Sequence, residues 1–172
     1  MKAELRTLLY ELFDAALRTS GVNARHRDKF AGRGDGLLVL IDPADHDLVL
    51  SNVIPPFSQL LASHNTGLSH PGDQDRRLRV RVVVHIGNIH DDHNGCSGEA
   101  LDTAFGLLHA PDAKTALKAA QGPLAAVTPA DVRKAAPPSF ARTSRASVRE
   151  PVTAQAGGHQ YQGWILPPSE VA

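Results

Sequence analysis

The sequence lacks the features that would secrete the chain or anchor it in a membrane. Cys96 is the only cysteine among 172 residues, so no disulfide can form within the chain, and a reducing compartment is expected. No apolar run approaches the about 20 residues needed to cross a bilayer. The N-terminus carries charged residues where a signal peptide would be apolar. These absences predict a cytoplasmic protein with no membrane partner.

The sequence also lacks an excess of charge of either sign. It has 18 Lys and Arg against 18 Asp and Glu, so its formal net charge is zero with neutral histidines. Because nucleic-acid binders present a strongly basic surface, this balance argues against a nucleic acid as partner. A chain of 172 residues can bury a sizeable core in one domain. We therefore expect a single domain over 1–172, with a less regular C-terminal part from about residue 137.

What the sequence does contain centres on a glycine-rich turn. The string Gly34-Asp35-Gly36 leads directly into the apolar run Leu37–Ile41. A short apolar run bounded by glycines predicts a strand buried on both faces, with Val22–Phe30 as its hairpin partner. Asp35 would then lie at the rim of the strand, where a carboxylate can bind a hard cation such as magnesium. The alternative is a structural turn in which Asp35 accepts hydrogen bonds from turn amides.

Apolar residues at helical spacing predict several amphipathic helices. These amphipathic helices are expected at Lys2–Arg18, within Val49–His64 from about Pro55 or Pro56, and at Glu99–Ala110. A short Ala-rich helix is expected at Asp112–Ala120, and a further helix is expected at Thr128–Ala135. Gly21 follows the first helix, where a C′ glycine is favoured. Thr128 followed by Pro129 is typical of an N-cap and first helical residue. The buried stripe of the Glu99–Ala110 helix is expected at Leu101, Ala104, Phe105 and Leu108.

Alternating and short apolar runs predict the strands. Arg76–Ile89 is the clearest, because Leu78, Val80 and Val82 alternate with polar residues. Further strands are expected at Leu124–Val127, Ala146–Val152 and Gln160–Leu166, the last two joined by a Gly157-Gly158 turn. The order of elements predicts an α+β fold in which helices cover a mostly antiparallel sheet.

The polar segment His90–Gly98 is a candidate metal site. His90, Asp91, His93 and Cys96 lie close together in sequence, and zinc sites use such ligands. Their spacing matches no closed zinc motif, and only one cysteine is present. The alternative is a hydrophilic hairpin loop that follows a buried strand.

Three blocks, in this order, carry a family resemblance: Gly34-Asp35-Gly36 with the strand after it, Arg79–Gly87 (RVRVVVHIG) and Gly98–Leu108 (GEALDTAFGLL). Together they resemble the catalytic domain of class III nucleotidyl (adenylate/guanylate) cyclases, above all its short, divergent actinobacterial versions. The resemblance implies a ferredoxin-like βαββαβ core, a nucleotide ligand, Mg2+ or Mn2+, and a homodimer with its site at the interface. Because the chain begins at the family's first helix, the core is expected to lack its first strand.

Only one of the family's functional residues is matched. Asp35 corresponds to one of two metal-binding carboxylates, and the other belongs to the missing first strand. The helix positions that usually carry Asn and Arg are Asp102 and Gly106, and the two base-reading positions fall on Ala31 and near Gly95. An arginine neutralises charge that develops on the phosphates, which a glycine cannot do.

These departures lead to three functional hypotheses. The first is a degenerate, catalytically inactive cyclase-like domain that dimerises and binds a nucleotide through Gly34, Asp35 and Gly36. The second is an active class III cyclase in which a partner chain supplies the missing groups. The third is a metal-binding protein that uses the His90–Cys96 segment.

Overall fold

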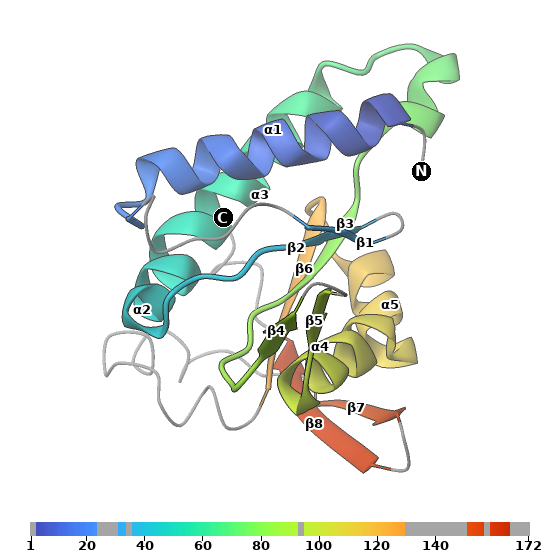
Figure 1. The fold of residues 1–172 in the computed structure, drawn as a ribbon. Coiled ribbons are helices and arrows are strands. Elements are labelled where there is room, and N and C mark those ends of the chain that lie inside the picture. The colour runs from blue at the N-terminus through green and yellow to red at the C-terminus, as the bar shows by residue number, and fades with distance from the viewer. Residues whose placement is uncertain are drawn as a thin grey trace. The chain divides into compact units, whose positions relative to one another are not determined.

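The computed structural model describes residues 3–23, 31–33, 36–92, 95–129, 151–156 and 159–165 (Figure 1). The chain divides into two compact units, Met1–Arg79 and Val80–Val171. The expectation of one cyclase-like domain over 1–172 stays a prediction. None of the described helices is long and apolar enough to cross a membrane.

The first unit is mainly helical (Figure 1). Its elements are α1 (Ala3–Thr19), β1 (Ala31–Arg33), β2 (Gly36–Leu38), the 3₁₀ turn η2 (Pro43–Asp45), α2 (His46–Leu48), the π-helical η3 (Val49–Val53), α3 (Ile54–Thr66) and the 3₁₀ turn η4 (Pro71–Arg76). The apolar stripes of α1 and α3 pack together, and the Phe13 and Phe57 rings meet edge to face with centroids 5.1 Å apart. Gly21 has a φ of +87°, which confirms the predicted glycine end of α1.

The second predicted helix begins earlier than expected. Pro55 and Pro56 do lie in the first turn of α3, but helical backbone already runs from His46 through α2 and η3. A proline lacks the N–H for an α-helical bond, and its ring clashes with the carbonyl four residues earlier. The π turn ahead of the prolines is wider, with the Ile54 N–H bonded to the Val49 carbonyl. This wider turn lets the helical path continue into the prolines.

The predicted hairpin exists, but its strands differ from the prediction. β1 and β2 pair antiparallel, with Ala31 opposite Leu38 and Arg33 opposite Gly36. The partner strand is therefore not Val22–Phe30, of which residues 24–30 lie outside the described part. The expected burial of Leu37–Ile41 on both faces is also wrong, since these residues are half-buried and β2 stops at Leu38.

The second unit contains a four-stranded sheet. Its elements are β3 (Val80–Val83), β4 (His90–Asp92), β5 (Gly95–Ser97), α4 (Glu99–His109), α5 (Pro111–Ala119), β6 (Leu124–Pro129), β7 (Pro151–Ala156) and β8 (His159–Ile165). The sheet order is β3-β6-β8-β7, with β3 parallel to β6 and the other pairs antiparallel. The α+β class is confirmed. The sheet is mixed, with one parallel and two antiparallel strand pairs, and the cyclase-like core stays a prediction. Helix α4 contacts all four strands, and every residue of β6 is buried.

Several predicted boundaries in this unit are wrong. Only Val80–Val83 of Arg76–Ile89 forms a strand, because the chain then leaves the sheet toward the β4–β5 hairpin. Thr128 is fully buried in β6 opposite Trp164, so it is not the N-cap of a helix, and residues 130–135 lie outside the described part. The described part of β7 begins at Pro151, and the predicted start of its strand at Ala146 lies outside the described residues. The predicted β7–β8 pairing itself is confirmed.

The buried face of α4 differs from the predicted stripe. Ala100, Leu101 and Leu107 are buried, whereas Phe105 and Leu108 are only half-buried. Leu107 belongs to a core cluster with residues of α5, β6 and β7. The helix is therefore rotated relative to the prediction, and this rotation frees the Phe105 side of α4 for the site described next.

Candidate functional site

An open groove of about 660 Å³ lies in the second unit between α4 and the β7–β8 hairpin. One wall comes from α4 and from its junction with α5, where Ala110 and Pro111 contribute. The other wall comes from Thr153, Ala154 and Gln155 of β7 and from β8. This size is that of small-molecule sites in proteins, which span about 300–1,000 Å³.

The wall from α4 is one face of that helix. Asp102, Phe105, Gly106 and His109 line the groove at spacings of three, four and seven residues from Asp102. Residues at these spacings lie above one another on a helix. Because Leu107 holds another face of α4 in the core, this stripe is directed away from the core and into the groove.

The hairpin wall is set by its strand register. Ala154 pairs with Tyr161, and the next pair on that face is Ala156 with His159. Residues directly opposite each other share a face of the sheet, so Tyr161 and His159 lie side by side, with ring centroids 6.5 Å apart. Tyr161 also packs against the core cluster, which anchors the inner end of this wall.

A glycine allows the hairpin to lie close to α4 and β6. At Gly163 a Cβ atom would come within 3.0 Å of the Thr128 carbonyl oxygen and 3.2 Å of Leu107 Cδ1. A side chain at this position would therefore push the hairpin outward and widen the groove.

The outer edge of β7 is held by α5. The backbone N–H of Thr153 donates a hydrogen bond to Asp112 Oδ2 at 3.3 Å. Asp112 lies in the first turn of α5, where a carboxylate also stabilises the positive end of the helix. One acidic residue thus fixes the position of the strand and neutralises the start of the helix beside the groove.

The chemistry of the groove follows from its side chains. Asp102 supplies the one carboxylate of the described lining, His109 and His159 supply imidazoles, and Phe105 and Tyr161 supply aromatic rings. No Lys or Arg is among the described lining residues. These groups can stack on a flat ligand and can accept hydrogen bonds from amino or hydroxyl groups, but they offer no permanent positive charge to a phosphate.

Of the sequence-predicted cyclase-like positions, the structure places Asp102 and Gly106 together on the groove face of α4. Gly34 and Asp35 lie outside the described residues. Gly36 begins β2, and its carbonyl accepts a hydrogen bond from the Tyr10 hydroxyl at 3.4 Å. Asp35 as a Mg2+ or Mn2+ ligand therefore stays a prediction.

The two predicted base-reading positions are part of short hairpins. Ala31 begins β1, and Gly95 begins β5 with a φ of +118°. Neither residue lines the groove. A positive φ, as at Gly95, is a backbone conformation that glycine adopts more readily than other residues.

The predicted metal segment forms the β4–β5 hairpin. His90 pairs with Ser97, whereas Asp91 pairs with Cys96, and His93 lies outside the described residues. Neighbouring residues of a strand point to opposite faces, so His90 and Cys96 lie on opposite faces of the hairpin. Within the described part of the chain, no three His, Cys, Asp or Glu residues gather in a group that could hold a metal ion.

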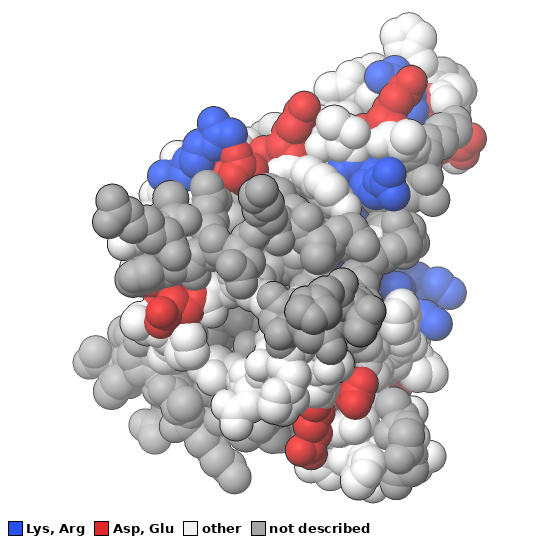
Figure 2. Space-filling model, in the orientation of Figure 1, with Lys and Arg blue, Asp and Glu red and all other residues white. Residues whose placement is uncertain are grey.

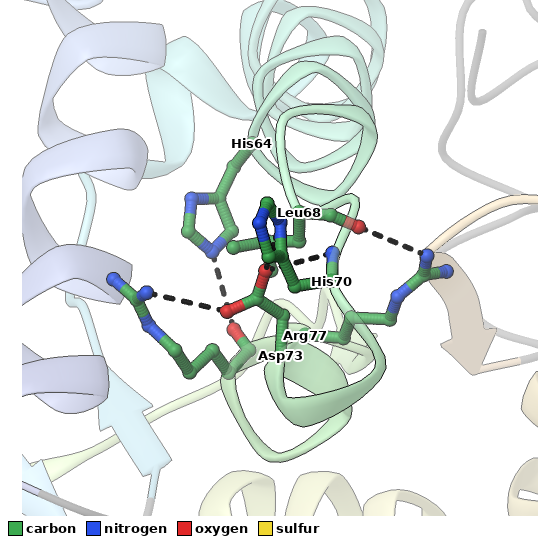
Figure 3. Close-up of polar contacts among 6 residues, drawn as sticks. His64, Leu68, His70, Asp73 and Arg77 are labelled. Atoms are coloured by element: carbon green, nitrogen blue, oxygen red, sulfur yellow. Dashed lines mark hydrogen bonds and ion pairs between the residues drawn. The ribbon is translucent and has the colours of Figure 1, made fainter.

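A second polar cluster lies at the end of α3 in the first unit (Figure 3). His64 Nε2 donates to the Arg76 carbonyl at 3.2 Å, and the His70 N–H donates to Asp73 Oδ2 at 3.1 Å. The Asp73 side chain also accepts from the Arg76 guanidinium at 3.4 Å. The His70–Asp73 bond belongs to the capping box that begins η4, and the other two bonds connect Arg76, at the end of η4, to α3 and to Asp73. Together they account for the cluster as a structural element.

Charged side chains of both signs are interspersed over the face of the molecule shown in Figure 2. The distribution agrees with the zero net charge of the sequence.

The sequence reasoning missed the groove residues that come from outside α4. His159 and Tyr161, with Thr153 and Gln155, come from a hairpin far along the chain, and no spacing pattern connects them to α4. His109 had a usable signal, because it lies seven residues after Asp102 on the same helix face. Comparison with protein-family models, curated proteins and solved structures finds no match for this chain.

Proposed function

We propose that this chain is a catalytically inactive, cyclase-like module that binds a nucleotide and dimerises. Three sequence blocks in the cyclase order support this proposal, as does the common groove face of Asp102 and Gly106. The observation that carries it is the lining of that groove, in which Gly106 stands at the usual arginine position and no described Lys or Arg replaces the lost charge.

The size of the catalytic defect follows from general enzyme chemistry. Losing one donor that stabilises developing charge reduces a rate by about 10²–10³. At Gly106 the donor is absent altogether, and Asp102 adds a negative charge near the same position. Both changes disfavour a transition state in which negative charge builds up on phosphate oxygens.

The proposal includes a homodimer. Class III cyclases build their site between two chains, so a cyclase-like module is expected to associate with a second copy of itself. Dimerisation would also stabilise the fold by mass action. Sedimentation equilibrium over a hundredfold concentration range tests this part, and a persistent monomer of 18.4 kDa would contradict it.

The functional test uses the full chain with ATP or GTP in the presence of Mg2+ or Mn2+. We expect heat of binding by calorimetry and no cyclic nucleotide by chromatography. Absence of binding to every nucleotide would contradict the module. Cyclic nucleotide formation that stops in Asp35→Ala would instead establish the alternative, an active cyclase.

A further inference from the structure

We infer that the groove between α4 and the β7–β8 hairpin holds the base and ribose of the ligand and leaves its phosphates outside. The inference rests on the proposed function and adds the part of the ligand that is recognised. It makes the groove a nucleoside site, in which affinity comes from stacking and neutral hydrogen bonds.

The charges around the groove argue against a buried phosphate. Asp102 carries the only permanent charge among the described lining residues, and it is negative. The groove also reaches His109, the last residue of α4, where the helix dipole is negative. A triphosphate placed here would meet repulsion from both sources.

The start of α5 does not reverse this conclusion. Helix N-termini bind anions through free backbone N–H groups, and Pro111 at the start of α5 borders the groove. Proline has no N–H to offer, however, and the Asp112 carboxylate in the first turn already places a negative charge near the positive end of the helix. An added phosphate would therefore compete with a carboxylate that is part of the fold.

The remaining groups of the groove suit a base and a sugar. Phe105 on α4 and Tyr161 on β8 present aromatic rings from the two walls, and His159 lies next to Tyr161. Aromatic side chains stack on nucleobases of any type. The Asp102 carboxylate can accept hydrogen bonds from a base amino group or from ribose hydroxyls.

The test compares adenosine and guanosine with their mono- and triphosphates by calorimetry of the full chain. EDTA is present, so that a metal ion at Asp35 cannot contribute to binding. We expect each nucleoside to bind at least as tightly as its monophosphate and more tightly than its triphosphate. Tighter binding of the triphosphate would overturn the inference while leaving nucleotide binding, the proposed function, intact.

Two variants locate the site. Phe105→Leu keeps an apolar side chain but removes a stacking ring, and it should weaken nucleoside binding by roughly 5- to 150-fold. Asp102→Asn removes the negative charge, so it should weaken nucleoside binding more than triphosphate binding. Glu11→Gln, an exposed change of the same charge on α1, is the matched control and should alter neither affinity.

Each remaining outcome is decisive. Nucleoside affinities that are the same in Phe105→Leu, Asp102→Asn and the unmodified chain would place binding elsewhere and overturn the inference alone. Failure of every nucleoside and nucleotide to bind, with or without Mg2+, would overturn the inference together with the proposed function.

Discussion

The side-chain amide of Asn65 binds the backbone of Leu78 on both sides. Asn65 Nδ2 donates to the Leu78 carbonyl at 2.8 Å, and Asn65 Oδ1 accepts from the Leu78 N–H at 2.9 Å. The pair acts like a short piece of β-ladder between the end of α3 and the segment after η4. It satisfies both polar groups of a residue whose side chain is buried.

The first prediction concerns the clamp that these two hydrogen bonds form between Asn65 and Leu78. Asn65→Ala leaves the N–H and the carbonyl of Leu78 without their partners, so it should lower the free energy of unfolding by about 1–3 kcal/mol. Urea denaturation measures the change. Ser63→Ala, an exposed substitution on the same helix, should stay within about 0.5 kcal/mol of the unmodified chain. Equal stability of the two variants would show that the clamp contributes nothing.

The second prediction concerns the close approach of Gly87 to α4. A Cβ atom at Gly87 would lie 2.6 Å from the Cβ of Ala100, a contact too short for two carbon atoms. Both are short side chains that cannot rotate away, so Gly87→Ala forces the backbone to move. We expect a loss of about 1–3 kcal/mol of stability.

A double-mutant cycle identifies the cause of that loss. Ala100→Gly removes the atom that the new methyl group would meet, so the Gly87→Ala change should cost much less in its presence. Gly122→Ala is the control, because no described atom lies within 4 Å of a Cβ at Gly122. Additive effects of Gly87→Ala and Ala100→Gly would refute the proposed contact.

The sequence predicted what short-range patterns determine. The apolar spacing of α1 and its glycine end at Gly21 depend on neighbouring residues, and both were found where expected. The N-cap pattern of Thr128 and Pro129 failed, because the same two residues are fully buried in the sheet. Local propensity is weaker than burial in a central strand.

The groove was beyond prediction for two physical reasons. Apolar residues occur almost all round α4, so their spacing could not determine which face meets the core. The structure shows which face of α4 meets the core, because Leu107 belongs to the core cluster and Phe105 lines the groove. The second wall depends on the long-range placement of the β7–β8 hairpin, and no local pattern in the sequence encodes that placement.

The third prediction concerns the exposed edge of β7. The Thr153 N–H points away from β8 toward Asp112, so Pro151 and Gln155, two residues to either side, also face outward. Pro151 has no N–H, and the N–H of Thr153 already donates its hydrogen bond to Asp112. Together they remove two of the three N–H positions along this edge, so an incoming strand would find only the Gln155 N–H as a donor here.

Removing the carboxylate of Asp112 should therefore allow this edge of β7 to pair with a strand of another copy of the chain. We expect Asp112→Ala to increase the weight-average mass above that of the unmodified chain in sedimentation experiments at equal concentration. Asp112→Asn keeps an oxygen acceptor for the Thr153 N–H and should behave like the unmodified chain. Unchanged association of Asp112→Ala would mean that Pro151 alone protects the edge.

The last prediction concerns Gly106, which lies inside α4 and lines the groove. Glycine in a helix interior is about 1 kcal/mol less favourable than alanine, so Gly106→Ala should raise the free energy of unfolding by up to about 1 kcal/mol. The added methyl group would enter the groove and should weaken nucleoside binding at the same time. A stabilised variant with weakened binding would indicate that the glycine keeps the groove open at a cost in helix stability. Gly106→Ala that binds as tightly as the unmodified chain would show that the ligand does not reach this part of α4.

Ala104→Gly is the converse control, because Ala104 lies on the same helix but outside the groove lining. It should destabilise α4 by about 1 kcal/mol and leave nucleoside affinity unchanged, which separates helix stability from the shape of the site.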